Sequence, residues 1–112
     1  MSGSDGARGR FRICTIGEMP LASVRRVEVA GHAPIAVYHL PDGYFATDDR
    51  CTHGEASLAE GEIDGDEIVC PFHLGKFDIR TGEATAAPCV EALTCHRLVI
   101  EDDSLYLLAM ED

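Results

Sequence analysis

The sequence predicts an all-β fold of antiparallel strands, and three observations support this expectation. Short apolar segments of strand length recur along the chain, separated by turn signals such as P-D-G at residues 41–43 and D-G-D at residues 64–66. No segment sustains the apolar period of a helix, and residues 56–60 offer one helical turn at most. The 112 residues suffice for one domain and contain no internal repeat. We therefore expect an antiparallel sandwich or barrel.

The domain is expected to span residues 10–112, after a tail rich in Gly and Ser, residues 1–9, that is predicted to be disordered. Apolar residues of strand-forming type then recur between turns, and the turns at residues 41–43, 64–66 and 101–104 each predict a hairpin. The expected strands cover residues 11–16, 24–29, 34–40, 44–46, 63, 68–69, 77–79, 93–100 and 105–109.

Two short motifs pair a cysteine with a histidine: C-T-H at residues 51–53 and C-P-F-H at residues 70–73. Each follows a predicted strand, and the hairpin between them can bring the two loops face to face. Two thiolates with two neutral imidazoles suit a tetrahedral zinc ion or an iron–sulfur cluster. Two His replacing two Cys on one iron is the ligand set of a Rieske [2Fe–2S] centre. The predicted metal ligands are Cys51, His53, Cys70 and His73.

This ligand set fixes the charge of the predicted cluster. Two ferric ions, two sulfides, two thiolates and two neutral imidazoles sum to zero, whereas four thiolates would leave two negative charges. Adding an electron to a neutral site costs less free energy, which raises the reduction potential. We expect the two cysteines to hold one iron and the two histidines to hold the iron that takes the electron.

A structural zinc site is the alternative for the same four residues. Zinc modules usually offer pairs of two cysteines or two histidines, and mixed C-x-H doublets are unusual among them. A zinc-held interaction module would be colourless and would carry no electrons. The doublets therefore favour the iron–sulfur cluster over zinc.

The chain resembles the small Rieske-type ferredoxins of bacterial aromatic-ring-hydroxylating dioxygenase systems over residues 11–110. The most specific parts are C-T-H-G at residues 51–54, C-P-F-H-L-G-K-F at 70–77, and R-T-G-E at 80–83 with A-A-P-C at 86–89. The resemblance implies a Rieske fold, with antiparallel β-sandwich layers, two cluster-binding loops at one tip and a third, proline-bearing loop over the cluster. The expected cofactor-binding residues beside the metal ligands are Gly54, Phe72, Leu74, Gly75, Phe77 and Pro88.

The resemblance also implies the partners. In this family electrons pass from NAD(P)H through a flavoprotein reductase to the ferredoxin, and then to the Rieske centre of a terminal oxygenase. The chain has no G-x-G-x-x-G fingerprint, so nucleotide and flavin belong to a partner, and we expect an electron carrier rather than an enzyme. The alternative is a Rieske-like small subunit of an assimilatory nitrite reductase, which would co-purify with a sirohaem protein. A monomer is the simplest expectation.

The charge of the chain is strongly acidic, with 20 Asp and Glu against 9 Lys and Arg and a net charge of −11. A field of this sign repels phosphate backbones, so we expect no nucleic-acid partner. No apolar run approaches the roughly 20 residues that span a bilayer, and the first residues lack the apolar region of a secretory signal. Acidic residues between the two motifs form either a solvated hairpin or a docking surface: Glu55, Glu60, Glu62, Asp64, Asp66 and Glu67.

Three cysteines and three histidines lie outside the two motifs. The cysteines Cys14, Cys89 and Cys95 form no obvious disulfide framework, and each is expected to be a small buried side chain. Free thiols favour a reducing compartment, so we expect a cytoplasmic protein. His32 lies far from the motifs in sequence, whereas His39 and His96 fall in strand-like runs and are expected to be sheet residues rather than ligands.

The chain departs from the Rieske proteins of cytochrome bc complexes in two respects. Those proteins carry an extra cysteine in each ligand loop and join the loops by a disulfide, whereas here Ala56 or its neighbour and Phe72 stand at those positions. They also carry a serine and a tyrosine that donate hydrogen bonds to cluster sulfurs. The corresponding residues here, Gly75 and Phe77, have no hydroxyl.

We predict a reduction potential in the lower part of the roughly −150 to +300 mV range of Rieske centres, because fewer donors stabilise the added electron. The potential should be nearly independent of pH between about 6 and 8, since the ligand imidazoles should keep their free nitrogens protonated. Voltammetry of the purified protein measures both quantities. A potential well above zero, or a steep slope in that pH window, would contradict the prediction.

Overall fold

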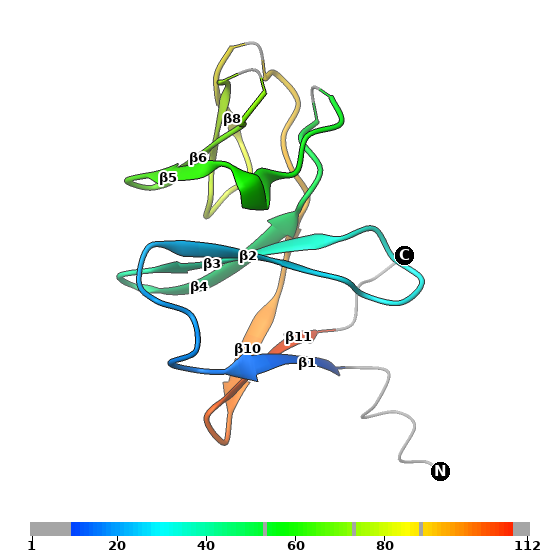
Figure 1. Cartoon of the computed structure of the whole chain (residues 1–112), viewed down its shortest axis with the longest axis vertical. Helices are drawn as coiled ribbons and strands as arrows, with labels where there is room; N and C mark the ends of the chain where they lie inside the picture. Colours follow the sequence, from blue (N-terminus) through cyan, green and yellow to red (C-terminus); the bar gives the residue numbers. More distant parts are fainter. Residues whose placement is uncertain (1–9, 53, 73, 88, 109–112) are drawn as a thin grey trace.

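The structure is a computed structural model and describes residues 10–52, 54–72, 74–87 and 89–108. In these residues the chain forms three antiparallel sheets that follow one another along the long axis of the molecule (Figure 1). The first half of the chain contributes β1 (Arg10–Thr15), β2 (Ser23–Val27), β3 (Ile35–Leu40), β4 (Gly43–Asp48) and a single 3-10 turn, η1 (Leu58–Glu60). The second half contributes β5 (Glu62–Asp64), β6 (Glu67–Val69), β7 (Lys76–Asp78), β8 (Ala84–Ala86), β9 (Cys95–His96), β10 (Leu98–Glu101) and β11 (Ser104–Leu108).

The sheets are β1-β11-β10, β2-β3-β4-β9 and β5-β6-β7-β8. Figure 1 shows the β5–β8 sheet at one end of the molecule, β2, β3 and β4 in the middle, and β1, β10 and β11 at the other end. The chain passes from the middle sheet to the end sheet within three residues, because β9 pairs with β4 whereas β10 pairs with β11. The predicted all-β, antiparallel layers are confirmed.

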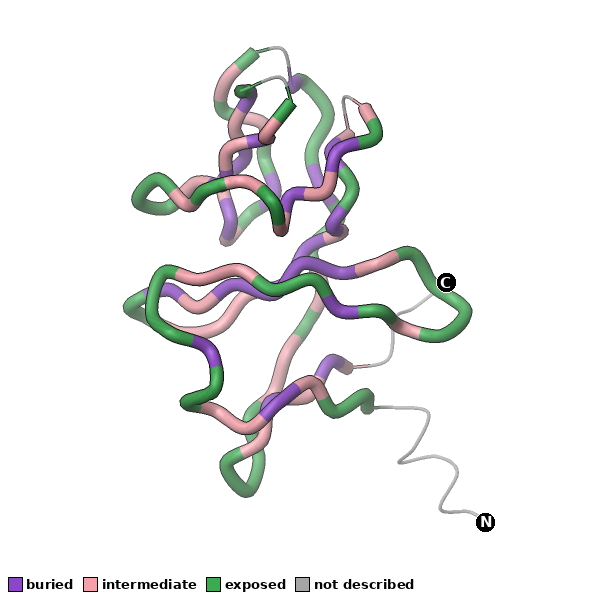
Figure 2. Tube along the Cα trace, in the orientation of Figure 1, coloured by how far each residue is buried: buried purple, intermediate pink, exposed green. Residues whose placement is uncertain are grey.

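The middle sheet separates two apolar cores, and β3 contributes to both. Side chains alternate between the two faces of a strand, so Ala36, Tyr38 and Leu40 enter one core while Ile35 and Val37 enter the other. All five are essentially inaccessible to solvent, and Figure 2 shows the buried trace running through the middle of the molecule. A strand buried on both faces explains why residues 35–40 are almost continuously apolar.

The core on the side of the β5–β8 sheet lies beneath the predicted ligand loops. Leu58, Ile68, Phe77 and Ile79 are fully buried there. The same cluster includes three cysteines: Cys51, Cys70 and Cys89. The opposite core gathers side chains of the β1-β11-β10 sheet, including Leu105 and Leu107, against the other face of β3.

Arg80 connects the β5–β8 sheet to the middle sheet at the surface. Its guanidinium donates to both carboxylate oxygens of Asp42, at 3.0 and 2.5 Å, and lies 2.8 Å from a carboxylate oxygen of Asp66. It also lies over the ring of Phe45, 5.2 Å from the ring centroid. The planar guanidinium suits this paired, stacked arrangement better than an ammonium would.

The structure corrects several predicted boundaries. The single strand predicted for residues 93–100 is wrong: it divides into β9 and β10, which belong to different sheets. Strand β8 (Ala84–Ala86) was not predicted, and β4 continues to Asp48 rather than ending at residue 46. The predicted hairpin at residues 101–104 is confirmed, with Asp102 and Asp103 both at positive φ as its two-residue turn.

Two other expectations concern the tail and the membrane. The predicted disordered tail, residues 1–9, lies outside them. Within the described part of the chain, no helix has the length and apolar character needed to cross a bilayer.

Candidate metal centre

The first ligand loop leaves the end of β4 and is closed by main-chain hydrogen bonds. The amide of Cys51 donates to the carbonyl of Ala56 at 2.9 Å, and the amide of Gly54 donates to the Cys51 carbonyl at 3.3 Å. Arg50 and Ser57 form an isolated antiparallel bridge at the base of the loop. These bonds satisfy backbone groups inside a tight turn and leave the Cys51 side chain 1% exposed.

The second ligand loop, between β6 and β7, repeats this closure. The amide of Cys70 donates to the carbonyl of Gly75 at 2.8 Å, which is the same five-residue spacing as Cys51 to Ala56. Leu74 donates to the Cys70 carbonyl at 2.9 Å, and it adopts a φ of +61° that a bulky residue rarely takes. Strained backbone of this kind persists where the surrounding structure over-determines it, often at functional sites.

The two loops lie over the same buried cluster, and a third segment, residues 86–87 and 89–91, lies against them. The Sγ atoms of Cys51 and Cys89 are 3.8 Å apart, and the Thr52 hydroxyl donates to the Glu91 carbonyl at 2.7 Å. Burial is the main cause that raises the pKa of the Cys89 thiol, to about 12, with the adjacent Cys51 as a further cause.

Asp49 fixes the first loop to the 3-10 turn that follows it. Its side chain is almost fully buried and accepts a hydrogen bond from the Ser57 hydroxyl at 2.6 Å and another from the Ala59 amide at 2.9 Å. Its main-chain carbonyl accepts from the Leu58 amide at 2.7 Å. Sequence reasoning did not identify Asp49, because its partners lie eight to ten residues away and no local motif marks them.

The structure brings together two of the four predicted metal ligands among the residues it describes. Cys51 and Cys70 are both buried, lie in the same apolar cluster, and form no disulfide. His53 and His73 lie outside the described residues, so their role remains a prediction. The two buried sulfurs, in loops closed by the same hydrogen bond, fit the thiolate half of the predicted cluster, and the histidines of the same motifs are expected to supply the imidazole half.

The other predicted cofactor-binding residues have contrasting environments. Gly75 is buried between the second loop and the third segment, and Gly54 is half-buried. Phe77 is fully buried in the core, where it places no hydroxyl near the sulfurs. Phe72 and Leu74 are 67% and 69% exposed, whereas Pro88 lies outside the described residues.

The cysteines and histidines outside the motifs largely follow expectation. Cys14 and Cys89 are buried as predicted, whereas Cys95 is exposed, because it lies in the short edge strand β9. His39 lies on β3 and stacks on Tyr44, with ring centroids 4.2 Å apart. His96 lies on β9, so the expected sheet positions of both histidines are confirmed.

Comparison with known proteins identifies the family. The model of the Rieske [2Fe–2S] domain matches residues 9–97. The chain belongs to the Rieske [2Fe–2S] domain family. Its cofactor is one Rieske-type cluster, as the two motifs predict.

Comparison with individual proteins shows which members of this family the chain resembles, namely the small ferredoxins. The chain is 42% identical to ferredoxin CarAc of Metapseudomonas resinovorans, over 87% of this chain and 91% of that protein. It is 41% identical to the ferredoxin component of the p-cumate 2,3-dioxygenase system of Pseudomonas putida, over 85% and 81% of the two chains. A ferredoxin solved in complex with the oxygenase of carbazole 1,9a-dioxygenase has a TM-score of 0.89 and 38% identity, covering 94% of this chain and 97% of that one. The chain is thus an electron-transfer ferredoxin of the dioxygenase type.

The nitrite reductase alternative is weaker. A nitrite reductase small subunit shares the fold with a TM-score of 0.75, but only 21% of its sequence. Likeness at that level supports the Rieske fold and carries no argument about function.

We predict that Gly75→Ala destabilises the protein and lowers its iron content. A Cβ at this position would lie well inside van der Waals contact of the Cys89 Sγ and 3.0 Å from the Ala86 carbonyl oxygen. Overpacking of this kind typically costs about 1–3 kcal/mol. Urea unfolding and iron analysis of the purified holoprotein measure the two effects.

The double variant Gly75→Ala, Cys89→Ala is the matched control, because it removes the sulfur that the new methyl group meets. It should recover part of the stability lost by Gly75→Ala alone. If the changes in unfolding free energy of Gly75→Ala and Cys89→Ala simply add in the double variant, the third segment does not pack against Gly75.

Proposed function

We propose that this ferredoxin carries single electrons through a low-potential Rieske cluster, from an NAD(P)H-dependent flavoprotein reductase to the terminal oxygenase of an aromatic-ring-hydroxylating dioxygenase. A Rieske cluster supplies reversible one-electron carriage at its site. Cys51, His53, Cys70 and His73 are the proposed ligands, with Gly54, Gly75, Phe77 and Pro88 around them. The observation that carries the proposal is the pair of matching loops that bury Cys51 and Cys70 at one end of a chain similar to dioxygenase ferredoxins.

The proposed contact surface is the apolar rim beside the two ligand loops. Phe72 and Leu74 are 67% and 69% exposed and flank the proposed ligand His73 in sequence, and Val90, in the third segment, is 82% exposed. Exposed apolar side chains grouped in this way are typical of interaction sites. A partner that covers this rim would lie beside the loops that hold the proposed ligands.

Acidic residues extend this surface toward β5. A groove beside the second loop is lined by Glu60, Gly61, Glu62, Val69, Pro71 and Leu74. Lys76 lies 2.9 Å from Asp64 and 3.9 Å from Glu67, and Arg80 lies 2.8 Å from Asp66. Among the residues that the structure describes, no ion pair involves Glu60 or Glu62. Their charges therefore remain uncompensated and would steer a basic partner surface to the rim.

The remaining expectations follow from the same role. A diffusing carrier must release each partner, so the contacts are proposed to be transient and the protein a cytoplasmic monomer. Stable co-purification with a sirohaem protein would instead favour the role of a nitrite reductase subunit.

We predict two irons and two acid-labile sulfides per chain, with a rhombic EPR signal that appears only after reduction by dithionite. Cys70→Ser should abolish both, because it removes a proposed ligand from a fully buried site. Cys95→Ser is the control and should keep full iron content, since that thiol lies outside the loops. One zinc per chain, no colour and no EPR signal would overturn the electron-transfer function.

We further predict that the double variant Glu60→Gln, Glu62→Gln slows electron transfer to an oxidised terminal oxygenase by about three- to tenfold at low salt, and weakens its salt dependence. The oxygenase of carbazole 1,9a-dioxygenase is a suitable probe, and stopped-flow spectroscopy of the reduced ferredoxin measures the rate.

The matched control is Asp102→Asn, Asp103→Asn, which changes the net charge equally in the β10–β11 turn at the opposite end of the molecule (Figure 1). This control should change the rate little. Equal effects of the two double variants would mean that net charge, and not the acidic groove, steers the partner.

A further inference from the structure

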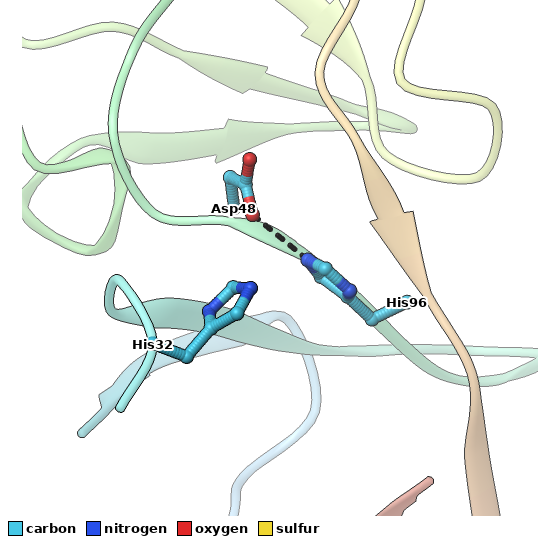
Figure 3. Close-up of side chains that lie close together, drawn as sticks. All are labelled: His32, Asp48 and His96. Carbon is cyan, nitrogen blue, oxygen red and sulfur yellow. Dashed lines mark hydrogen bonds and ion pairs between the residues drawn. The ribbon is translucent and has the colours of Figure 1, made fainter. Parts of the chain in front are cut away.

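Three side chains that the cluster does not use converge beside the middle sheet: His32, Asp48 and His96. Their nearest ligand atoms all lie within 4.8 Å of one another, and the Nε2 of His96 is 2.8 Å from the Oδ1 of Asp48 (Figure 3). The three residues come from the β2–β3 connection, the end of β4 and β9. None of them belongs to the two cysteine–histidine motifs.

The ring of His32 is held in a defined orientation. Its Nδ1 lies 2.7 Å from the carbonyl oxygen of Ala33. A carbonyl oxygen only accepts, so Nδ1 carries the proton and Nε2 keeps its lone pair. Figure 3 shows this second nitrogen directed toward Asp48 and His96. A backbone carbonyl that fixes the tautomer in this way is characteristic of metal-binding histidines.

The other two groups are fixed by the sheet. β9 pairs with β4 through Ala46 and His96, and the Asp48 amide donates to the Thr94 carbonyl at 2.9 Å. The His96 side chain is only 6% exposed, whereas Asp48 is 35% exposed and His32 lies at the surface. The ring of His32 meets that of His96 edge to face, with centroids 5.6 Å apart. The cluster is therefore rigid on its inner side and open on its outer side.

We propose that His32, Asp48 and His96 form a binding site for a divalent transition-metal ion of the zinc class. Two imidazole nitrogens and one carboxylate oxygen are a common three-ligand set for zinc, with the fourth position left to water. Zinc bonds of about 2.0–2.1 Å place tetrahedral ligand atoms roughly 3.3 Å apart. The ion takes the place of the proton between His96 and Asp48. The exposed ring of His32 moves by up to roughly 1.5 Å, from ligand atoms within 4.8 Å of one another to the roughly 3.3 Å of a tetrahedral site.

The site is tested on the holoprotein, so that the cluster already occupies the cysteine–histidine motifs and they offer no competing ligands. Equilibrium dialysis against micromolar Zn²⁺, with zinc and iron measured together by mass spectrometry, should give one zinc per chain beyond the cluster iron. His32→Gln should weaken zinc binding at least tenfold without loss of iron, since losing one of three ligands should cost at least as much as losing an outer-shell partner. His32 is exposed, so this variant should fold.

Two matched variants identify the ligands. His39→Gln removes a histidine that bonds the Met19 carbonyl and stacks on Tyr44, and it should leave zinc binding unchanged. Cys95→Ser removes the exposed thiol next to His96 and should also leave it unchanged. The proposal is overturned if the wild-type holoprotein binds no zinc, if His32→Gln binds zinc as tightly as the wild type, or if Cys95→Ser abolishes binding.

Discussion

One constraint governs the two ligand loops: each must bury a cysteine sulfur while every buried backbone N–H and C=O group of the loop still finds a hydrogen-bond partner. In each ligand loop the cysteine amide donates to the carbonyl five residues later, so the chain turns back on itself around the sulfur. Buried amides without partners are costly, and this closure leaves the cysteine side chain to face the apolar core. Because Cys51 and Cys70 are closed in the same way, the two loops bring their sulfurs into one cluster of buried side chains.

Asp48, the last residue of β4, and Asp49, which follows it, serve two separate sites. Successive side chains of an extended chain point to opposite sides, and Asp48 contacts His96 while Asp49 accepts hydrogen bonds from Ser57 and Ala59. Asp49 thereby anchors the ligand loop, whereas Asp48 belongs to the histidine cluster beside the middle sheet. The two sites share a strand end but no side chain.

The surface near the ligand loops combines exposed apolar residues with uncompensated negative charge. Lys76 and Arg80 at that end are engaged by Asp64, Asp66 and Glu67. Glu60 and Glu62 are left to act at longer range, beside the exposed Leu74. Long-range attraction followed by a small apolar contact allows fast association without slow release, which is what an electron carrier requires.

The sequence by itself determined the chemistry of the centre and most of the strands. The spacing of Cys51 and Cys70 relative to their histidines predicts the ligand set, because mixed doublets suit few metals, and the turn residues mark the hairpins. The resemblance to Rieske proteins also places Gly75 and Phe77 where proteins of cytochrome bc complexes carry hydroxyls, and the structure buries the Phe77 side chain in the core.

Only the tertiary structure decided which distant residues meet. The chain switches sheets between His96 and Leu98, so one apolar run became two strands, and no local pattern signals such a change. Asp49 with Ser57, Cys51 with Cys89, and His32 with His96 are contacts between segments whose separation carries no periodicity. Local sequence indicates strand propensity and the type of metal ligand. Contacts between distant segments depend instead on how the three sheets pack around the two apolar cores.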